Sequence, residues 1–149
     1  MTPPRPKTRL SETEVVVRSY ELDSFSHVNH AVFLNYLEYA RFEALRTGGL
    51  SRELMAERGW GVYVVRIEVD YLKEARMDDR LLVRTQLAGF RRTSMVLRQE
   101  IVRPGEEEEV LVRAEVHAVW VGASGRPMRV PGEVKAALGP GTPWSGGDQ

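Results

Sequence analysis

Hydrophobic and polar residues alternate along most of the second half of the chain. Between residues 62 and 72, for example, Val65, Ile67 and Val69 alternate with charged residues, which is the period of a half-buried β-strand. Short turns rich in polar residues or glycine separate such segments. Together with one stretch near the start, this pattern predicts five strands, at residues 14–20, 62–72, 81–90, 94–102 and 110–121.

The stretch between the first two predicted strands has a longer period. Apolar residues recur there at every third or fourth position, which predicts an amphipathic helix from about residue 30 to residue 47. Asn29 is placed to cap its start, and Gly48 and Gly49 are placed to end it. The stripe expected to face the core comprises Phe33, Tyr36, Leu37, Ala40 and Ala44.

Two aromatic residues of this helix, Tyr39 and Phe42, fall outside the apolar stripe. We expect a wrapped sheet or a second subunit to cover them. Shorter helices are predicted at residues 51–58 and 131–138. A strand, a long helix and four further strands joined by short turns predict an α+β fold with one antiparallel sheet against one helix.

The composition is that of an ordinary globular domain of 149 residues. Its 21 basic and 21 acidic residues balance, which disfavours nucleic acid as a partner because phosphate binding needs a basic excess. The absence of cysteine excludes disulfides and a thiol nucleophile. With no apolar run of membrane-spanning length and no signal-like start, we expect no membrane partner and a cytoplasmic location. Flexible tails are predicted at residues 1–12 and 139–149, around a single domain at 13–138.

The segment that joins the first predicted strand to the long helix carries the candidate chemistry. Asp23, His27, Asn29 and His30 lie together just ahead of the helix, whose first backbone N–H groups lack partners and carry partial positive charge. A carbonyl oxygen could lie on those N–H groups while Asp23 acts on the carbonyl carbon as base or nucleophile. The alternative is that Asp23 merely accepts backbone hydrogen bonds in an Asx turn.

Residues 23–41, DSFSHVNHAVFLNYLEYAR, resemble the hot-dog-fold acyl-CoA thioesterases of the 4-hydroxybenzoyl-CoA thioesterase-like branch. That motif reads roughly D-x-x-G-H-V-N-N-A-x-Y-x-x-Y-x-E-x-A-R, and plant acyl-carrier-protein thioesterases share its H-V-N core. The resemblance continues weakly through residues 69–72, 78–81 and 125–127. It implies a curved antiparallel sheet of about five strands wrapped around one long helix, and a homodimer or homotetramer with sites at the interface. It also implies hydrolysis of an acyl-CoA thioester without a metal or redox cofactor.

The resemblance assigns roles to the residues of the joining segment. Asp23 matches the catalytic aspartate, as general base or nucleophile, and His30 matches the position whose backbone N–H lines the oxyanion hole. His27 and Asn29 match positions that shape the loop and lie near the chemistry. The chain departs from the motif at three positions: Ser26 replaces the usual glycine, His30 replaces the second asparagine, and Phe25 replaces a polar residue of the plant enzymes.

Two of these departures change an expectation. Ser26 is expected to alter the backbone φ of the loop, because glycine tolerates conformations that serine does not. Phe25 is expected to narrow the acyl pocket. The length and type of the acyl group, and the choice between coenzyme A and a carrier protein, stay open.

Basic turn residues are candidates for the phosphates of coenzyme A. Arg91 and Arg92 lie in a predicted turn between two strands, and guanidinium forks match phosphate geometry. Lys73 and Arg76 are further candidates of the same kind. Solvated surface is the alternative for all four residues.

The same residues have alternative interpretations. Glu38 is a reserve carboxylate, although an ion pair with Arg41 one turn later explains it more simply. A metal at His27 and His30 lacks a third ligand apart from Asp23. An enoyl-CoA hydratase that pairs His27 with Asp23, or an acyl-CoA-binding module without catalysis, are the alternative functions.

Overall fold

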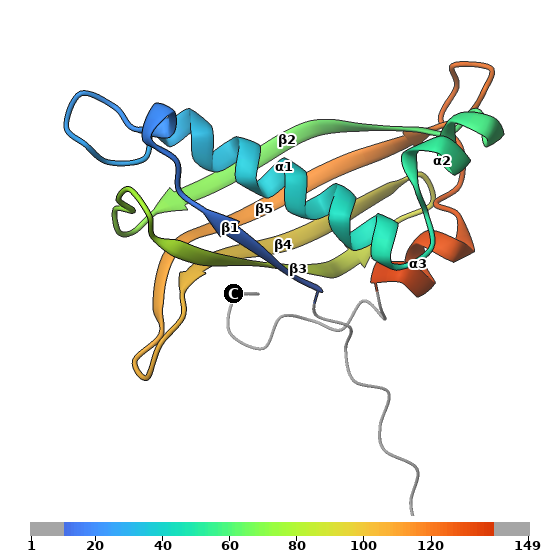
Figure 1. Cartoon of the computed structure of the whole chain (residues 1–149). Coiled ribbons are helices and arrows are strands. Elements are labelled where there is room, and N and C mark those ends of the chain that lie inside the picture. The colour runs from blue at the N-terminus through green and yellow to red at the C-terminus, as the bar shows by residue number, and fades with distance from the viewer. Residues whose placement is uncertain (1–10, 139–149) are drawn as a thin grey trace, which may run out of the picture.

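A computed structural model describes residues 11–138, in which one long helix lies across one face of a five-stranded antiparallel sheet (Figure 1). The strand order is β1-β3-β4-β5-β2. The predicted α+β architecture is confirmed. The strands are β1 (Ser11–Val16), β2 (Gly61–Tyr71), β3 (Arg80–Phe90), β4 (Ser94–Arg103) and β5 (Glu109–Val121), and the helices are η1 (Ser19–Glu21), α1 (His30–Thr47), α2 (Arg52–Arg58) and α3 (Gly132–Leu138).

The first strand begins earlier than predicted. Ser11 and Glu12, which were expected in the N-terminal tail, pair with Thr85 and Arg84 of β3. The strand ends at Val16, and the chain then turns through η1 instead of continuing to residue 20. The polar start of this edge strand has no hydrophobic period to mark it. The rest of both predicted tails lies outside the described residues.

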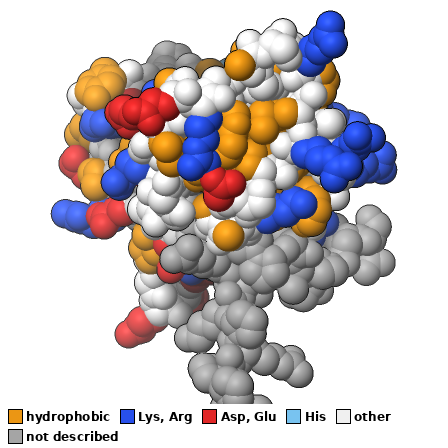
Figure 2. Space-filling view, turned by 90° about the vertical axis from the view of Figure 1, so that its right-hand side faces the viewer, with side chains coloured by type: hydrophobic (Ala, Val, Ile, Leu, Met, Phe, Trp, Pro, Cys, Tyr) orange, Lys and Arg blue, Asp and Glu red, His pale blue; other side chains and the backbone are white. Residues whose placement is uncertain are grey.

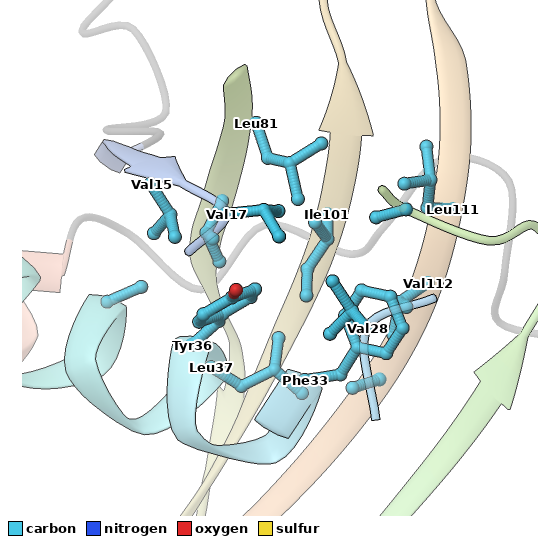
Figure 3. Close-up of a cluster of buried hydrophobic side chains, with 14 residues drawn as sticks. Val15, Val17, Val28, Phe33, Tyr36, Leu37, Leu81, Ile101, Leu111 and Val112 are labelled. Carbon is cyan, nitrogen blue, oxygen red and sulfur yellow. The ribbon is translucent and has the colours of Figure 1, made fainter. Parts of the chain in front are cut away.

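The core lies between α1 and the sheet. Phe33, Tyr36 and Leu37 of α1 point toward aliphatic side chains of β1, β3, β4 and β5 (Figure 3). The predicted stripe is therefore the buried face of the helix. A second cluster around Trp120 fills the other end, where α3 packs on α1. A Cβ on Gly48 would lie 2.3 Å from Cβ of Ala137, so this contact requires glycine.

Strand β2 forms one edge of the sheet, because it pairs only with β5. Tyr63, Val64 and Val65 are exposed on this strand, and the pairing shifts register between Val64 and Arg66. Tyr39 of α1 is also half exposed. Part of the apolar surface expected to be covered is therefore uncovered in the single chain.

Candidate active site

A tight loop at residues 23–27 joins η1 to α1 (Figure 1). An isolated bridge between Leu22 and Val28 closes its base. The backbone N–H of Asp23 donates to the carbonyl of His27 at 2.7 Å, and that of Ser26 donates to the carbonyl of Asp23 at 3.0 Å. These bonds fix the loop before any substrate binds.

The carboxylate of Asp23 is held by one of its two oxygens. Its Oδ1 accepts from the backbone N–H groups of Phe25 at 2.9 Å and His27 at 3.2 Å. The Asx turn considered as an alternative is therefore present. No donor within residues 11–138 bonds the second oxygen, Oδ2. The turn orients the carboxylate and leaves this oxygen available for chemistry.

The start of α1 has one free backbone donor. Asn29 is the N-cap, as predicted, and its side chain accepts from the N–H of Ala31 at 2.8 Å. The carbonyl of Asn29 accepts from Val32 at 2.9 Å and Phe33 at 3.3 Å. Among the described residues, no acceptor bonds the N–H of His30. This N–H also lies at the positive end of the helix dipole, where it suits a developing negative charge.

A buried carboxylate secures the chain just ahead of the loop. Glu21 accepts from the hydroxyl of Tyr36 at 2.7 Å and from the backbone and side chain of Arg18 at 2.9 and 2.8 Å. Burial raises the pKa of Glu21, but the bonds from Arg18 and Tyr36 outweigh it and lower the pKa overall. Burial and the bond to Glu21 raise the pKa of Tyr36. The carbonyl of Glu21 also accepts from the N–H of Asn29 at 3.0 Å, which ties both ends of the segment together.

Tyr71, at the end of β2, contacts the first residue of α1. Its hydroxyl donates to the carbonyl of His30 at 3.0 Å, and the two rings meet edge to face. Burial raises the pKa of Tyr71. The sequence offered Tyr71 only as part of a weak motif, because its contact with the helix depends on how the sheet curves.

The side chain of His27 turns away from Asp23. Its Nε2 lies 2.7 Å from Oε2 of Glu74, so the His27–Asp23 pair assumed for a hydratase is not formed. Phe25, at the tip of the loop, is 79% exposed. The expected narrowing of the acyl pocket by Phe25 therefore stays a prediction.

Ser26 occupies the glycine position of the motif with φ of 66°. This left-handed conformation is the one that glycine adopts freely and other residues adopt at a cost. The loop therefore has a conformation typical of glycine despite the serine.

No salt bridge joins Glu38 and Arg41, so the predicted ion pair is not formed, although the charge of Glu38 still acts to raise the pKa of Arg41. Arg41 turns into the protein and donates to Oε1 of Gln99 at 3.0 Å. Glu38 is exposed and lies in the wall of a cavity beside the middle and second half of α1.

The turn between β3 and β4, which carries Arg91 and Arg92, lies near α3 and at the opposite end of α1 from the loop at residues 23–27 (Figure 1). The two ends of α1 are about 27 Å apart, at 1.5 Å per residue over its 18 residues. A second loop lies alongside, since the N–H of Val130 donates to the carbonyl of Arg92 at 2.9 Å. This loop carries Arg126 and Arg129, which sequence reasoning missed.

These four arginines differ from the other arginines in residues 11–138. Every other described arginine contacts a carboxylate, an amide oxygen or an aromatic ring, whereas Arg91, Arg92, Arg126 and Arg129 have no such side-chain partner among residues 11–138. Figure 2 shows Lys and Arg side chains around a hydrophobic patch on this end of the molecule. The cluster suits an anionic group.

Two kinds of feature are absent from residues 11–138. No group of three or more His, Asp or Glu side chains there could hold a metal ion. No helix in that range combines the length and the apolar character needed to cross a membrane.

Comparison with known proteins gives consistent matches. The family model of the thioesterase-like superfamily matches residues 17–138. The chain is 39% identical to the acyl-CoA thioester hydrolase YbgC of Escherichia coli O6:H1, over 76% of this chain and 84% of that protein. It is 31% identical to the chloroplastic acyl-acyl carrier protein thioesterase ATL2 of Arabidopsis thaliana, over 86% of this chain and 68% of that protein.

Solved structures agree with the fold. The 4-hydroxybenzoyl-CoA thioesterase of Pseudomonas sp. strain CBS-3 superposes with a TM-score of 0.78 at 24% identity, covering 87% of this chain and 99% of that one. The hot-dog fold implied by the sequence motif is thus confirmed. The chain belongs to the thioesterase-like superfamily.

Proposed function

We propose that this protein hydrolyses an acyl-CoA thioester to the free acid and coenzyme A. The observation that supports this proposal is the junction of loop and helix. Within residues 11–138, one oxygen of Asp23 has no donor, and the next helix begins with the N–H of His30, which has no acceptor. A carboxylate and an amide so placed match the two demands of acyl transfer, an attacking group and an oxyanion donor.

The reaction follows from these two groups. As general base, Asp23 takes a proton from water, and the hydroxide adds to the thioester carbon. As nucleophile, Asp23 adds to that carbon itself and forms an anhydride that water then cleaves. In either course the carbonyl oxygen gains negative charge against the N–H of His30, and the C–S bond breaks to release coenzyme A as its thiol after protonation.

The protein is proposed to act as a homodimer, alone or paired into a tetramer. Strand β2 has an open edge with exposed Tyr63, Val64 and Val65, and a second copy would pair with it antiparallel across a two-fold axis. Antiparallel pairing sets the end of β2 at Tyr71 beside the start of β2 in the partner. Each His30 amide then lies at the interface, and Val65→Lys is expected to yield monomers in sedimentation experiments, whereas Arg66→Lys is not.

The dimer also gives the arginine cluster a role. Within one chain the cluster and Asp23 lie at opposite ends of α1, but the two-fold axis brings the cluster of one copy toward the loop of the other. We propose that Arg91 and Arg92, with Arg126 and Arg129, bind the phosphates of coenzyme A. Replacing Arg126 by Glu is expected to raise KM and to leave kcat nearly unchanged, and added salt should raise KM of the wild type more than that of the variant.

Thiol release from a series of short, long and aromatic acyl-CoA substrates tests the function. Asp23→Asn is expected to lower kcat at least about 100-fold, because it removes the base or nucleophile. Asp78→Asn is the control, since Asp78 is an exposed carboxylate in a turn whose positive φ asparagine tolerates. Equal turnover by wild type and Asp23→Asn would exclude the role proposed for Asp23. The cytoplasmic location stays a prediction.

A further inference from the structure

The loop between β2 and β3, residues 72–79, lies at the same end of the molecule as the active-site loop, residues 23–27 (Figure 1). Backbone hydrogen bonds join the β2–β3 loop to the chain on both sides of the active-site loop. Ahead of it, the N–H of Val17 donates to a carbonyl of the β2–β3 loop at 3.0 Å. Behind it, the N–H of Val28 donates to the carbonyl of Ala75 at 2.9 Å. The β2–β3 loop therefore supports both ends of the segment that carries the candidate chemistry.

The side chain of Glu74 adds a contact to this support. Its Oε2 lies 2.7 Å from Nε2 of His27, and its Oε1 accepts from Nη2 of Arg76 at 2.7 Å. The hydrogen bond from Arg76 lowers the pKa of Glu74, and the charge of His27 acts in the same direction. Glu74 is therefore ionised at neutral pH and favours this place for the imidazole of His27.

His27 is in turn bonded to Asp23 through the backbone in both directions. The N–H of Asp23 donates to the carbonyl of His27 at 2.7 Å, and the N–H of His27 donates to Oδ1 of Asp23 at 3.2 Å. The direction of the other carboxylate oxygen, Oδ2, depends on these bonds and on the bond from Phe25, because no donor within residues 11–138 holds Oδ2 itself. A shift of His27 would therefore move the reacting oxygen of Asp23.

The β2–β3 loop is itself anchored to the sheet. Arg103, the last residue of β4, donates from Nη2 to the carbonyl of Glu74 at 3.0 Å and to Oδ2 of Asp79 at 2.9 Å. The N–H of Leu72 donates to the carbonyl of Leu111 in β5 at 2.7 Å. Contacts thus run without a break from the central strands through Glu74 and His27 to Asp23.

The other two cations of the β2–β3 loop already have carboxylate partners. Arg76 contacts Glu74, and Nζ of Lys73 lies 3.6 Å from Oε2 of Glu109. Both residues were candidates for the phosphates of coenzyme A from the sequence. A phosphate bound there would compete with these carboxylates, so the contacts favour a structural task for the loop over substrate binding.

We propose that Glu74 is a positioning residue, which sets the place of Asp23 by holding His27. The proposal rests on the thioester hydrolysis proposed above, and Glu74 touches no reacting atom in it. A single exposed ion pair contributes little to stability. A displacement of a reacting group by 1 Å, in contrast, can lower a rate about 100-fold. Loss of Glu74 should therefore affect turnover far more than it affects folding.

Kinetics of thiol release from acyl-CoA substrates test this role. Glu74→Ala is expected to lower kcat about 10-fold, because the remaining backbone bonds limit the displacement of Asp23. KM should change less than about twofold, since the arginines proposed to bind coenzyme A lie in other loops. Glu74→Gln, which keeps the shape of the side chain and removes its charge, should change kcat in the same direction. Equal kcat values for wild type and both variants would overturn the proposal, and so would a rise in KM at constant kcat, which would assign the loop to substrate binding.

Glu14→Ala is the matched control. Glu14 is an exposed carboxylate of β1 that contacts Nη1 of Arg80 at 2.9 Å, so its loss removes one arginine–carboxylate contact, as Glu74→Ala does. This control should keep the kcat of wild type. Glu74 is exposed, and melting temperatures close to that of wild type should show that all three variants fold. A fall in kcat as large in Glu14→Ala as in Glu74→Ala would refute a specific role for Glu74.

A double-mutant cycle tests whether Glu74 acts through His27. His27→Ala removes the same contact from the other side and should lower kcat. Adding Glu74→Ala to His27→Ala should then cause no further loss, because the contact is already absent. Independent effects that multiply in the double variant would show that Glu74 acts by another route and would overturn the assignment.

Amide hydrogen exchange, followed by NMR, gives a readout that does not require turnover. The N–H groups of Asp23 and His27 should exchange about 2- to 5-fold faster in Glu74→Ala than in wild type, as the loss of one exposed ion pair implies. They should exchange at the wild-type rate in Glu14→Ala. Unchanged exchange in Glu74→Ala would overturn the proposal. Failure of the proposed function would look different, because Asp23→Asn would then hydrolyse as fast as wild type while exchange still responded to Glu74→Ala.

Discussion

Replacing Tyr36 by Phe removes a single hydrogen bond beneath the active-site loop. Tyr36 is 3% exposed and donates to Glu21 at 2.7 Å, while its ring meets Phe33 edge to face. The ring contacts survive the change, so the loss is one bond to a buried, charged acceptor, about 1.5–3 kcal/mol. For a domain of this size, that corresponds to a melting temperature lower by about 5–10 °C.

The measurement is thermal or urea unfolding at pH 7, at one fixed protein concentration because the proposed dimer would make stability depend on concentration. Tyr39→Phe is the matched control: it removes the same hydroxyl one turn along the same helix, where the bond to Glu43 is exposed and 3.3 Å long. That variant should change stability by less than about 0.5 kcal/mol. The reasoning fails if the two variants lose the same free energy of unfolding.

The penalty of Tyr36→Phe should also depend on pH. The pKa of Glu21 is lowered in the folded protein, so Glu21 stabilises the fold above the ordinary glutamate pKa of about 4.3 and loses this effect as the pH falls below it. Tyr36 contributes to that lowering. The difference between wild type and variant should therefore shrink between pH 7 and about pH 3. A difference that stays constant over this range would mean that Glu21 is not the charged acceptor.

Further changes test other contacts. Ser26→Gly should stabilise the protein by about 1 kcal/mol, because it relieves a left-handed φ at a non-glycine residue; a lower melting temperature would contradict this. Gly48→Ala should destabilise by about 1–3 kcal/mol, since the new Cβ would collide with Ala137. Gly132→Ala is its control, because a Cβ there meets no atom within 4 Å, and similar losses in both variants would refute the steric argument.

Local chemistry made the helix and its cap predictable from the sequence. The polar side chain of Asn29 and the missing side chain of Gly48 act on their own turns of the backbone, so the bounds of α1 needed no knowledge of the rest of the fold. The strands followed from the alternation of apolar and polar residues, which is also a local pattern. The start of β1 did not, because Ser11 and Glu12 are ordered by pairing with β3, more than sixty positions along the chain.

The site was only partly predictable. The motif indicated Asp23 and His30, but sequence spacing does not reveal which donors the fold has already used. The buried bond between Glu21 and Tyr36 joins residues on either side of the loop, and neither pattern nor charge signalled it. Arg126 and Arg129 were missed because only the pairing of Val130 with Arg92 brings the two loops together.

The open edge of β2 also has a consequence for the newly made chain. An unpaired strand with apolar side chains is a template on which other unfolded chains can stack. Here the irregular pairing at Val64 and the charges of Arg66, Glu68 and Asp70 interrupt that template after a few residues. Newly made chains should therefore resist stacking into fibres. A variant with an uninterrupted β2 should instead be lost to aggregation during synthesis.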